Sequence, residues 1–138
     1  MTHMTQAEKE TFLADLHVGV VSLARDGAGP LTVPIWYDYT AGGELWMLTG
    51  PESRKGKLMD VGTHISLCAQ TEDAPYRYVS VEGAITSIEP ATSAEGLAMA
   101  IRYLGDEMGR AYSESSDGGS VTVRMTPENW LAVDYNKR

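Results

Sequence analysis

Apolar residues recur along the chain at two spacings, one typical of helices and the other typical of strands. Thr5 and Glu8 form a capping box, a pattern that marks the start of a helix, and Thr92 and Glu95 form a second one. Apolar residues at helical spacing follow both boxes, namely Phe12, Leu13 and Leu16 after the first and Leu97, Ile101, Leu104 and Met108 after the second. We therefore expect one helix that ends near residues 17–19 and another that includes Met108.

Seven shorter segments alternate between apolar and polar residues or are rich in β-branched and aromatic ones, which is typical of strands. They cover residues 18–24, 31–39, 44–48, 64–70, 76–85, 120–125 and 131–135. Strands outnumber helices, and most of them are joined as hairpins. We therefore expect a mainly β fold over residues 1–138, a single domain. It would be a six- to seven-stranded antiparallel barrel, closed or nearly closed, with peripheral helices.

The segment 31–39 contains a proline, Pro34, which cannot donate a hydrogen bond to a neighbouring strand. Pro34 therefore marks an edge strand, a bulge or a place where a ligand approaches the backbone. Tyr37, Asp38 and Tyr39 follow it and have two interpretations. They exchange a proton with a substrate, or they are hairpin residues with packed rings and solvated polar ends, and we expect the second.

Composition narrows the class of protein. The chain has 138 residues, a formal net charge of −8 and 43% hydrophobic residues, as expected of a folded globular protein rather than a nucleic-acid binder. It has neither an apolar run of bilayer length nor a secretory leader, so we expect no membrane insertion. Its single cysteine, Cys68, suits a reducing cytoplasm, and we expect that thiol to pack in the core.

The residues with catalytic or metal-binding chemistry show no familiar spacing. Three scattered histidines (His3, His17 and His64) and one cysteine give no metal-ligand pattern, so no metal site is predicted. Four methionines at apolar positions are expected to fill the core: Met47, Met59, Met99 and Met108.

One basic cluster stands out in this acidic chain. Three of its 11 basic residues, Arg54, Lys55 and Lys57, fall within four positions, after a predicted strand and before a short apolar segment at residues 58–61. A Gly-Pro turn followed by Ser53 and basic residues at a helix start is suited to holding a phosphate. The alternative is a solvated basic turn that caps a short helix.

With these elements in place, the chain resembles the split β-barrel superfamily of flavin-binding proteins, which includes the pyridoxamine-phosphate oxidases and the deazaflavin-dependent reductases. The resemblance spans roughly residues 5–135, and its most specific motif is Leu-Thr-Gly-Pro-Glu-Ser-Arg-Lys at residues 48–55. Two further motifs are Pro-Ile-Trp-Tyr at residues 34–37 and Tyr-Val-Ser-Val-Glu-Gly at residues 78–83. Within the superfamily, the chain is most similar to the B type of actinobacterial flavin/deazaflavin oxidoreductases.

The resemblance implies a role for individual residues. Arg54, Lys55 and Lys57 would hold the cofactor phosphate in the turn that begins at Gly50, with Thr49 and Ser53 hydrogen-bonding beside them. Pro34, Trp36 and Leu48 would lie against the cofactor ring. Tyr78 stands where the oxidases have a glutamine that contacts FMN, so it is a cofactor-contacting position with a different side chain.

The resemblance also implies a homodimer with the cofactor at the subunit interface. The expected activity is hydride transfer from reduced coenzyme F420, a deazaflavin, to a small conjugated acceptor. The alternatives are an FMN-dependent oxidoreductase of the same fold and a non-catalytic protein that sequesters a flavin or haem. Oxidation of vitamin B6 is not expected, because the chain lacks the Arg-x-His-type segment of the oxidases and has no histidine after His64.

Overall fold

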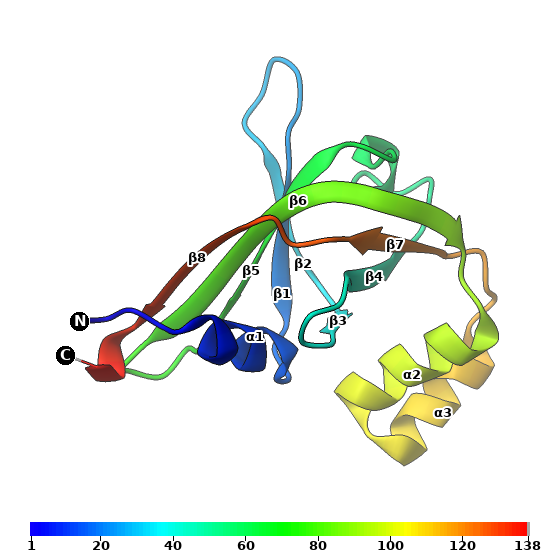
Figure 1. Ribbon diagram of the computed structural model, residues 1–138. Helices are drawn as coiled ribbons and strands as arrows, with labels where there is room; N and C mark the ends of the chain where they lie inside the picture. The colour runs from blue at the N-terminus through cyan, green and yellow to red at the C-terminus, as the bar shows by residue number, and fades with distance from the viewer. Residues whose placement is uncertain (138) are drawn as a thin grey trace.

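The computed structural model describes residues 1–137, which form one curled β-sheet with three α-helices around it (Figure 1). The elements in chain order are α1 (Gln6–Ala14), β1 (Gly19–Leu23), β2 (Leu31–Ile35), β3 (Tyr37–Tyr39), β4 (Leu45–Thr49), η1 (Gly56–Leu58), β5 (His64–Gln70), β6 (Arg77–Pro90), α2 (Ser93–Leu104), α3 (Asp106–Ser115), β7 (Val121–Met125), β8 (Asn129–Asp134) and η2 (Tyr135–Lys137). The two η elements are single turns of 3-10 helix.

The sheet is antiparallel throughout, with the strand order β2-β1-β5-β6-β7-β4-β3 and with β8 also paired to β6. Strand β6 is 14 residues long and joins the two halves, because its first part pairs with β5 and β8 and its last part pairs with β7. The end strands β2 and β3 are consecutive in the chain, so the curled sheet nearly closes on itself. The predicted mainly β, antiparallel split barrel is confirmed.

One predicted strand is divided in two. Residues 31–39 form β2 and β3, separated at Trp36, because the chain leaves β1 as a partner and pairs next with β4. Pro34 lies in β2 opposite Val20, at the end of the sheet order, where its missing N–H group leaves no ladder position unsatisfied. The edge-strand interpretation of Pro34 is confirmed, and the approach of a ligand at Pro34 stays a prediction.

The interior of the barrel contains the apolar side chains that alternate along the strands, and α1 packs over them with Phe12 and Leu13. This helix begins at its capping box as predicted, but it ends at Ala14, which leaves Leu16 exposed. Two core assignments were wrong. Met108 is 64% exposed, and Cys68 lies on the outer face of β5, half-buried, because Leu67 and Ala69 point inward.

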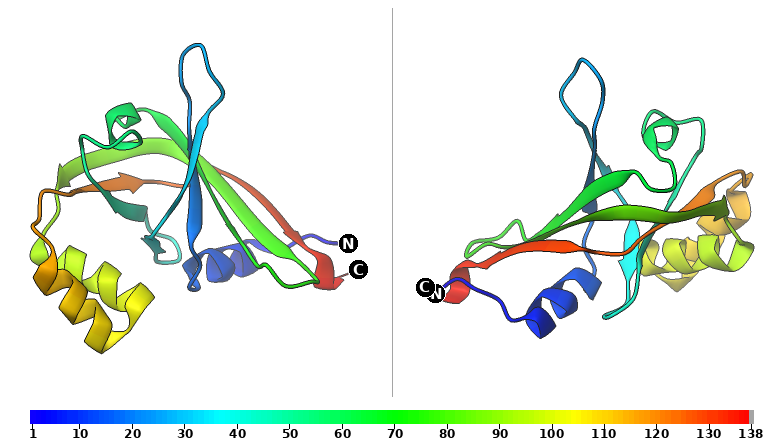
Figure 2. Two further views of the ribbon diagram at one scale, coloured as in Figure 1. Left: turned by 180° about the vertical axis from the view of Figure 1, so that it is seen from behind. Right: turned by 45° about the horizontal axis from the view of Figure 1, so that its top comes forward.

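The second capping box begins α2, but the helix does not continue to Met108. Gly105 has a φ of 85° and ends α2, after which α3 runs back along it (Figure 2). Residues 113–115 are the last turn of α3. The pair α2–α3 extends from the end of β6, whereas the two termini lie together at the other end of the sheet (Figures 1 and 2).

Within residues 1–137, no helix has both the length and the apolar character needed to cross a bilayer.

Candidate functional site

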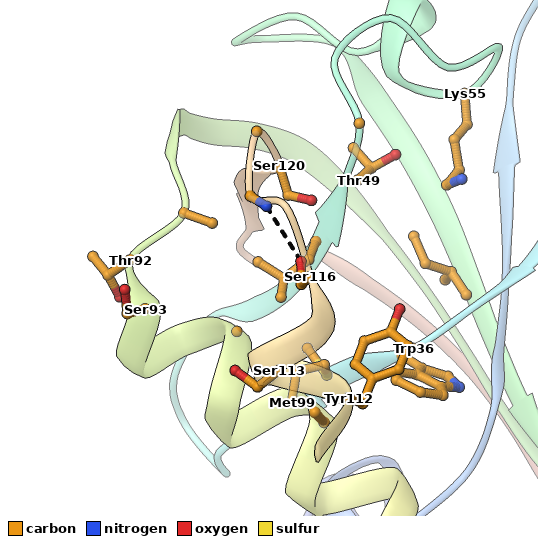
Figure 3. A pocket seen from close by; sticks show the side chains of 18 of the residues that line it. Trp36, Thr49, Lys55, Thr92, Ser93, Met99, Tyr112, Ser113, Ser116 and Ser120 are labelled. Atoms are coloured by element: carbon orange, nitrogen blue, oxygen red, sulfur yellow. Dashed lines mark hydrogen bonds between the residues drawn. The ribbon is translucent and has the colours of Figure 1, made fainter. Parts of the chain in front are cut away.

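A groove of about 620 Å³ lies between the barrel and the α2–α3 pair. The barrel contributes the corner between β2 and β3, the end of β4 and Lys55 of the turn that follows it. The opposite wall consists of the start of α2, the end of α3 and residues 116–120 (Figure 3). The volume is in the range of sites for small molecules and cofactors.

Arg102 of α2 fixes one end of the helix pair to the barrel. Its guanidinium group donates hydrogen bonds to the carbonyl oxygens of Tyr37 (3.0 Å), Ala14 (3.2 Å) and Asp15 (3.0 Å). It also forms an ion pair with Asp38 at 3.3 Å, and its side chain is 17% exposed. A largely buried arginine with this many partners positions the groove wall rather than a ligand.

The neighbouring residue Tyr103 makes a second attachment. Its hydroxyl accepts from the amide of Tyr37 (3.0 Å) and lies 2.6 Å from the carbonyl oxygen of His17. Its ring stacks on Trp36, with 4.9 Å between centroids and 5° between planes. Burial raises the pKa of Tyr103, so the hydroxyl stays protonated in this role. Sequence reasoning missed both Arg102 and Tyr103, because an arginine and a tyrosine on an amphipathic helix carry no local signal of such contacts.

The start of α2 is held to β7 by Glu95. Its carboxylate accepts from the Thr92 amide (2.9 Å), the Thr122 hydroxyl (2.9 Å) and the Arg124 guanidinium (2.6 Å). The hydrogen bond from the Thr92 backbone amide lowers the pKa of Glu95, and the contacts with Thr122 and Arg124 lower it further. The capping box therefore has a tertiary role as well as a local one.

The turn after β4 is closed by hydrogen bonds of its own residues. The Ser53 hydroxyl donates to the Gly50 carbonyl oxygen (2.7 Å), accepts from the Gly56 amide (3.1 Å) and lies 3.2 Å from the Thr49 hydroxyl. A Cβ atom on Gly56 would lie 2.1 Å from the Gly50 carbonyl oxygen, so the turn requires glycine there. Thr49 is 4% exposed and lines the groove.

The helix start expected at the basic cluster is a single turn of 3-10 helix, η1, which includes Lys57. The amides of Lys57, Leu58 and Met59 donate to carbonyl oxygens within the turn. The macrodipole of a helix start is therefore not available to an anion here. Within residues 1–137, the amides of Arg54 and Lys55 make no hydrogen bond, so they remain as donors.

The three basic side chains of the turn differ in position. Lys55 is half-buried and lines the groove, whereas Arg54 and Lys57 are exposed and are not among its lining residues. None of the three forms an ion pair with a carboxylate of the described chain. Their charge is therefore available to an external anion.

Of the residues predicted to lie against a cofactor ring, Pro34, Trp36 and Leu48 all line the groove, as does Gly50. One face of the Trp36 indole is covered by Tyr103, and Tyr112 of α3 lies tilted beside it at 5.8 Å between centroids (Figure 3). Trp36 is therefore part of an aromatic cluster within the chain.

Tyr78 is not brought together with the others. It lies near the start of β6, opposite Gln70 and Val133, whereas the groove adjoins the far end of that strand. The rings of Tyr37 and Tyr39 are buried as expected, but their hydroxyls are not solvated. They donate to the Leu13 carbonyl oxygen (2.7 Å) and to the Glu10 carboxylate (3.3 Å), which favours packing over proton exchange.

Sequence reasoning missed the whole second wall of the groove. The residues of this wall lie 38 to 65 positions after Lys55 and are Ser93, Gly96, Tyr112, Ser116 and Ser120. Ser93 and Gly96 belong to α2, and the return of α3 along α2 brings Tyr112 to the same side of the groove. Small and hydroxyl-bearing residues in a polar segment gave no signal beyond that of a loop.

Comparison with known proteins gives a consistent assignment of the fold. The family described as Pyridoxamine 5'-phosphate oxidase matches residues 5–134. No curated protein matches the chain. Among solved structures, the conserved hypothetical protein Rv2991 from Mycobacterium tuberculosis is similar, with 24% identity and a TM-score of 0.77 over 99% of this chain and 88% of that one.

Two further structures have the same fold at lower identity. An F420 reductase has 20% identity and a TM-score of 0.71, covering 88% of this chain and 94% of its own. An FAD-binding protein from Mycobacterium smegmatis has 13% identity and a TM-score of 0.63, covering 94% and 95%. Because the family match extends over nearly the whole chain, the protein belongs to the pyridoxamine 5'-phosphate oxidase family.

Proposed function

We propose that the protein is a flavin-type oxidoreductase that binds coenzyme F420 and transfers a hydride to a small conjugated acceptor. The observation that carries the proposal is the groove itself, in which the half-buried, unpaired Lys55 is the one charged side chain among the described lining residues. Such a site suits a ligand that presents a phosphate beside Lys55 and a neutral planar ring along the rest of the groove.

The donors beside Lys55 fit the phosphate of such a cofactor. The Lys55 ammonium and the amides of Arg54 and Lys55 have no acceptor in the described part of the chain. Arg54 and Lys57 add positive charge from the exposed side of the turn. The Ser53 hydroxyl mainly closes the turn, so we assign it a positioning role. Pro34 and Leu48 offer an apolar surface next to Trp36, suited to a planar ring.

When bound, a reduced deazaflavin supplies a hydride, and the acceptor takes up that hydride and one proton. The protein would hold the phosphate at the turn, align the ring beside Trp36 and keep water from the reacting faces with the α2–α3 wall.

The choice of coenzyme F420 over FMN depends on the resemblance, supported by an F420 reductase among the similar structures. FMN remains the alternative cofactor, since it also presents a phosphate and since FAD-binding proteins share the fold. A protein that sequesters a flavin or haem without turnover is the third candidate. We further propose a homodimer with the cofactor between the subunits, as the resemblance implies.

Titration with coenzyme F420 and with FMN, followed by fluorescence, tests the proposal. We expect tight and selective F420 binding that is weakened about tenfold or more in Lys55→Ala, because a hydrogen bond to a charged group contributes about 1.5–3 kcal/mol. Lys9→Ala is the matched control, because this variant removes the same charge from α1, away from the groove.

Selective binding of FMN would identify FMN, and not coenzyme F420, as the cofactor. Cofactor binding without reduction of any conjugated acceptor would favour the sequestering protein. If neither cofactor bound, or if Lys55→Ala bound both as tightly as Lys9→Ala, the groove would not be a flavin-type site.

A further inference from the structure

A cleft of about 570 Å³ lies at the end of the sheet that carries the two termini, away from the α2–α3 pair (Figure 2). One side of it comes from the connection between β5 and β6 and from the first residue of β6, and the other side comes from the end of β8 and η2. It shares no lining residue with the groove. The lining residues are polar or charged apart from one proline, and they are Thr71, Asp73, Pro75, Arg77, Asp134 and Asn136.

Arg77 carries the one positive charge among these described lining residues, and its guanidinium group is unpaired. Within residues 1–137 that group makes neither a hydrogen bond nor an ion pair. The other two half-buried arginines of the described chain, Arg102 and Arg124, each form an ion pair with a carboxylate. A charge taken partly out of water is normally stabilised by such a partner, so the donors of Arg77 are available to a ligand.

The guanidinium group of Arg77 is held against the core but stays open to the cleft. Its Cζ atom lies over the Phe12 ring at 5.1 Å from the centroid, and Phe12 is 2% exposed. Among residues 1–137, the one fully enclosed side-chain nitrogen or oxygen atom without a partner is Nε2 of His17. The unpartnered nitrogen atoms of Arg77 are therefore accessible from outside.

Hydrogen bonds fix the two sides of the cleft relative to each other. The Thr71 amide donates to the Arg77 carbonyl oxygen (2.9 Å), and the Thr71 hydroxyl accepts from the Arg77 amide (2.9 Å). Across the cleft, the Tyr135 amide donates to the Tyr76 carbonyl oxygen (3.0 Å), and Arg77 is the partner of Asp134 in the ladder between β6 and β8. The cleft is thus formed before a ligand enters, which favours binding.

Two carboxylates line the same cleft without pairing with Arg77. The Oδ1 atom of Asp134 accepts from the backbone amide and from the side-chain amide of Asn136, both at 2.9 Å. Asp73 is exposed and forms no ion pair within residues 1–137. A simple anion would be attracted by Arg77 but repelled by the two carboxylates, whereas a ligand that carries an ammonium group beside its carboxylate matches both signs of charge.

We infer that this cleft binds a free α-amino acid by its zwitterionic end. The ligand carboxylate would accept hydrogen bonds from the planar fork of Arg77, and the ligand ammonium group would lie at Asp73 and Asp134. A free amino acid fits better than a peptide end, because only the free amino acid has both charges on one carbon atom. The site is separate from the proposed cofactor site and does not depend on it.

The test titrates the full chain with L-alanine and follows amide chemical shifts by NMR. Propionate lacks the ammonium group and ethylamine lacks the carboxylate, so they are the matched probes. We expect L-alanine to cause saturable shifts at residues 71–77 and 134–136. Propionate should bind about two- to fivefold more weakly, and ethylamine about tenfold or more, because the contact of the half-buried Arg77 is the stronger one.

Two variants test the two charges. Arg77→Gln should weaken L-alanine binding about tenfold or more, and Arg110→Gln is its control, since it removes the same charge from α3 outside the cleft. Asp73→Asn should weaken L-alanine binding about two- to fivefold. It changes an exposed side chain, so it tests the site without disturbing the contact with Phe12. Its control is Glu72→Gln, which removes the neighbouring charge outside the cleft.

Several results would overturn the inference. They are the absence of saturable shifts with L-alanine, binding of propionate or ethylamine as tight as that of L-alanine, and binding of L-alanine by either cleft variant as tight as by its control. Lys55→Ala should bind L-alanine as the wild type does. Loss of binding in that variant would place the probe in the groove and would also overturn the inference.

Discussion

At the scale of single residues, Tyr103 shows how one hydroxyl connects three parts of the chain. It accepts from the Tyr37 amide, donates to the His17 carbonyl oxygen at 2.6 Å and lies 2.9 Å from the Tyr37 carbonyl oxygen, while its ring stacks on Trp36 in the groove. A backbone amide that loses its acceptor in a part-buried place is costly, because water does not fully replace the bond. Tyr103 therefore supports both the fold and the candidate site.

We expect Tyr103→Phe to lower the free energy of unfolding by about 1–3 kcal/mol, because the Tyr37 amide is left without its acceptor. The stacked ring is retained, so the change reports on the hydroxyl. Urea denaturation measures the effect, with Tyr76→Phe as a control that removes an exposed hydroxyl. Equal stability of the two variants would contradict this role of Tyr103.

At the scale of elements, the α2–α3 pair depends on the absence of a side chain at Gly109. A Cβ atom there would lie 2.6 Å from the Ile101 Cα and 2.7 Å from the Ile101 backbone nitrogen, and neither backbone atom yields as a flexible side chain would. Gly109 is thus a point at which α3 lies directly against the backbone of α2. The distance between these helices places Tyr112, which lines the groove.

We expect Gly109→Ala to destabilise the protein by about 1–3 kcal/mol through overpacking, despite the better helix propensity of alanine. Gly96→Ala is the matched control, since Gly96 lies in α2 with no atom within 4 Å of an added Cβ. That variant is expected to gain about 0.5–1 kcal/mol. Thermal denaturation of both separates packing from propensity, and a gain in both would contradict the close crossing.

At the scale of the whole molecule, the protonation of one buried side chain affects stability. That side chain is His17, which lies where α1, β1 and α2 meet. Its Nε2 atom is buried and has no hydrogen-bond partner among residues 1–137. Its ring stacks on Phe12 with 4.4 Å between centroids, and its carbonyl oxygen accepts from the Tyr103 hydroxyl. Burial lowers the pKa of His17, and it outweighs a hydrogen bond to the Phe12 backbone and the charge of Asp15, which favour protonation. Arg77 and Arg102 act in the same direction as burial.

Because the folded pKa of His17 is below its unfolded value of 6.5, the unfolded chain binds the proton first as pH falls. We therefore expect the free energy of unfolding to decline from about pH 6.5 downwards, until the folded pKa is reached. Urea denaturation between about pH 7.5 and pH 5 measures this decline, in a window above that in which Glu8 and Glu95 titrate.

His17→Phe should flatten the profile in this window, since phenylalanine keeps the stack on Phe12 and cannot take up a proton. His3→Ala is the control, because His3 is exposed and its replacement should leave the slope as in the wild type. An unchanged slope in His17→Phe would assign the pH dependence to other groups.

Local patterns in the sequence determined the elements and the class of fold. Both capping boxes begin helices where predicted, and the alternation of apolar residues identified strands such as β5 at its observed bounds, because these signals depend on neighbours within a few positions. The motif at residues 48–55 also led to the turn that places Lys55 in the groove.

The tertiary structure decided what depends on distant contacts. The change of partner at Trp36, the reversal at Gly105 and the exposure of Met108 follow from how the sheet curls and how α3 returns along α2. The wall opposite Lys55 comes from the same reversal, and its serines and tyrosine have no spacing that marks a site. A sequence pattern indicates which face of a helix or strand is apolar, whereas tertiary packing decides which residues that face contacts.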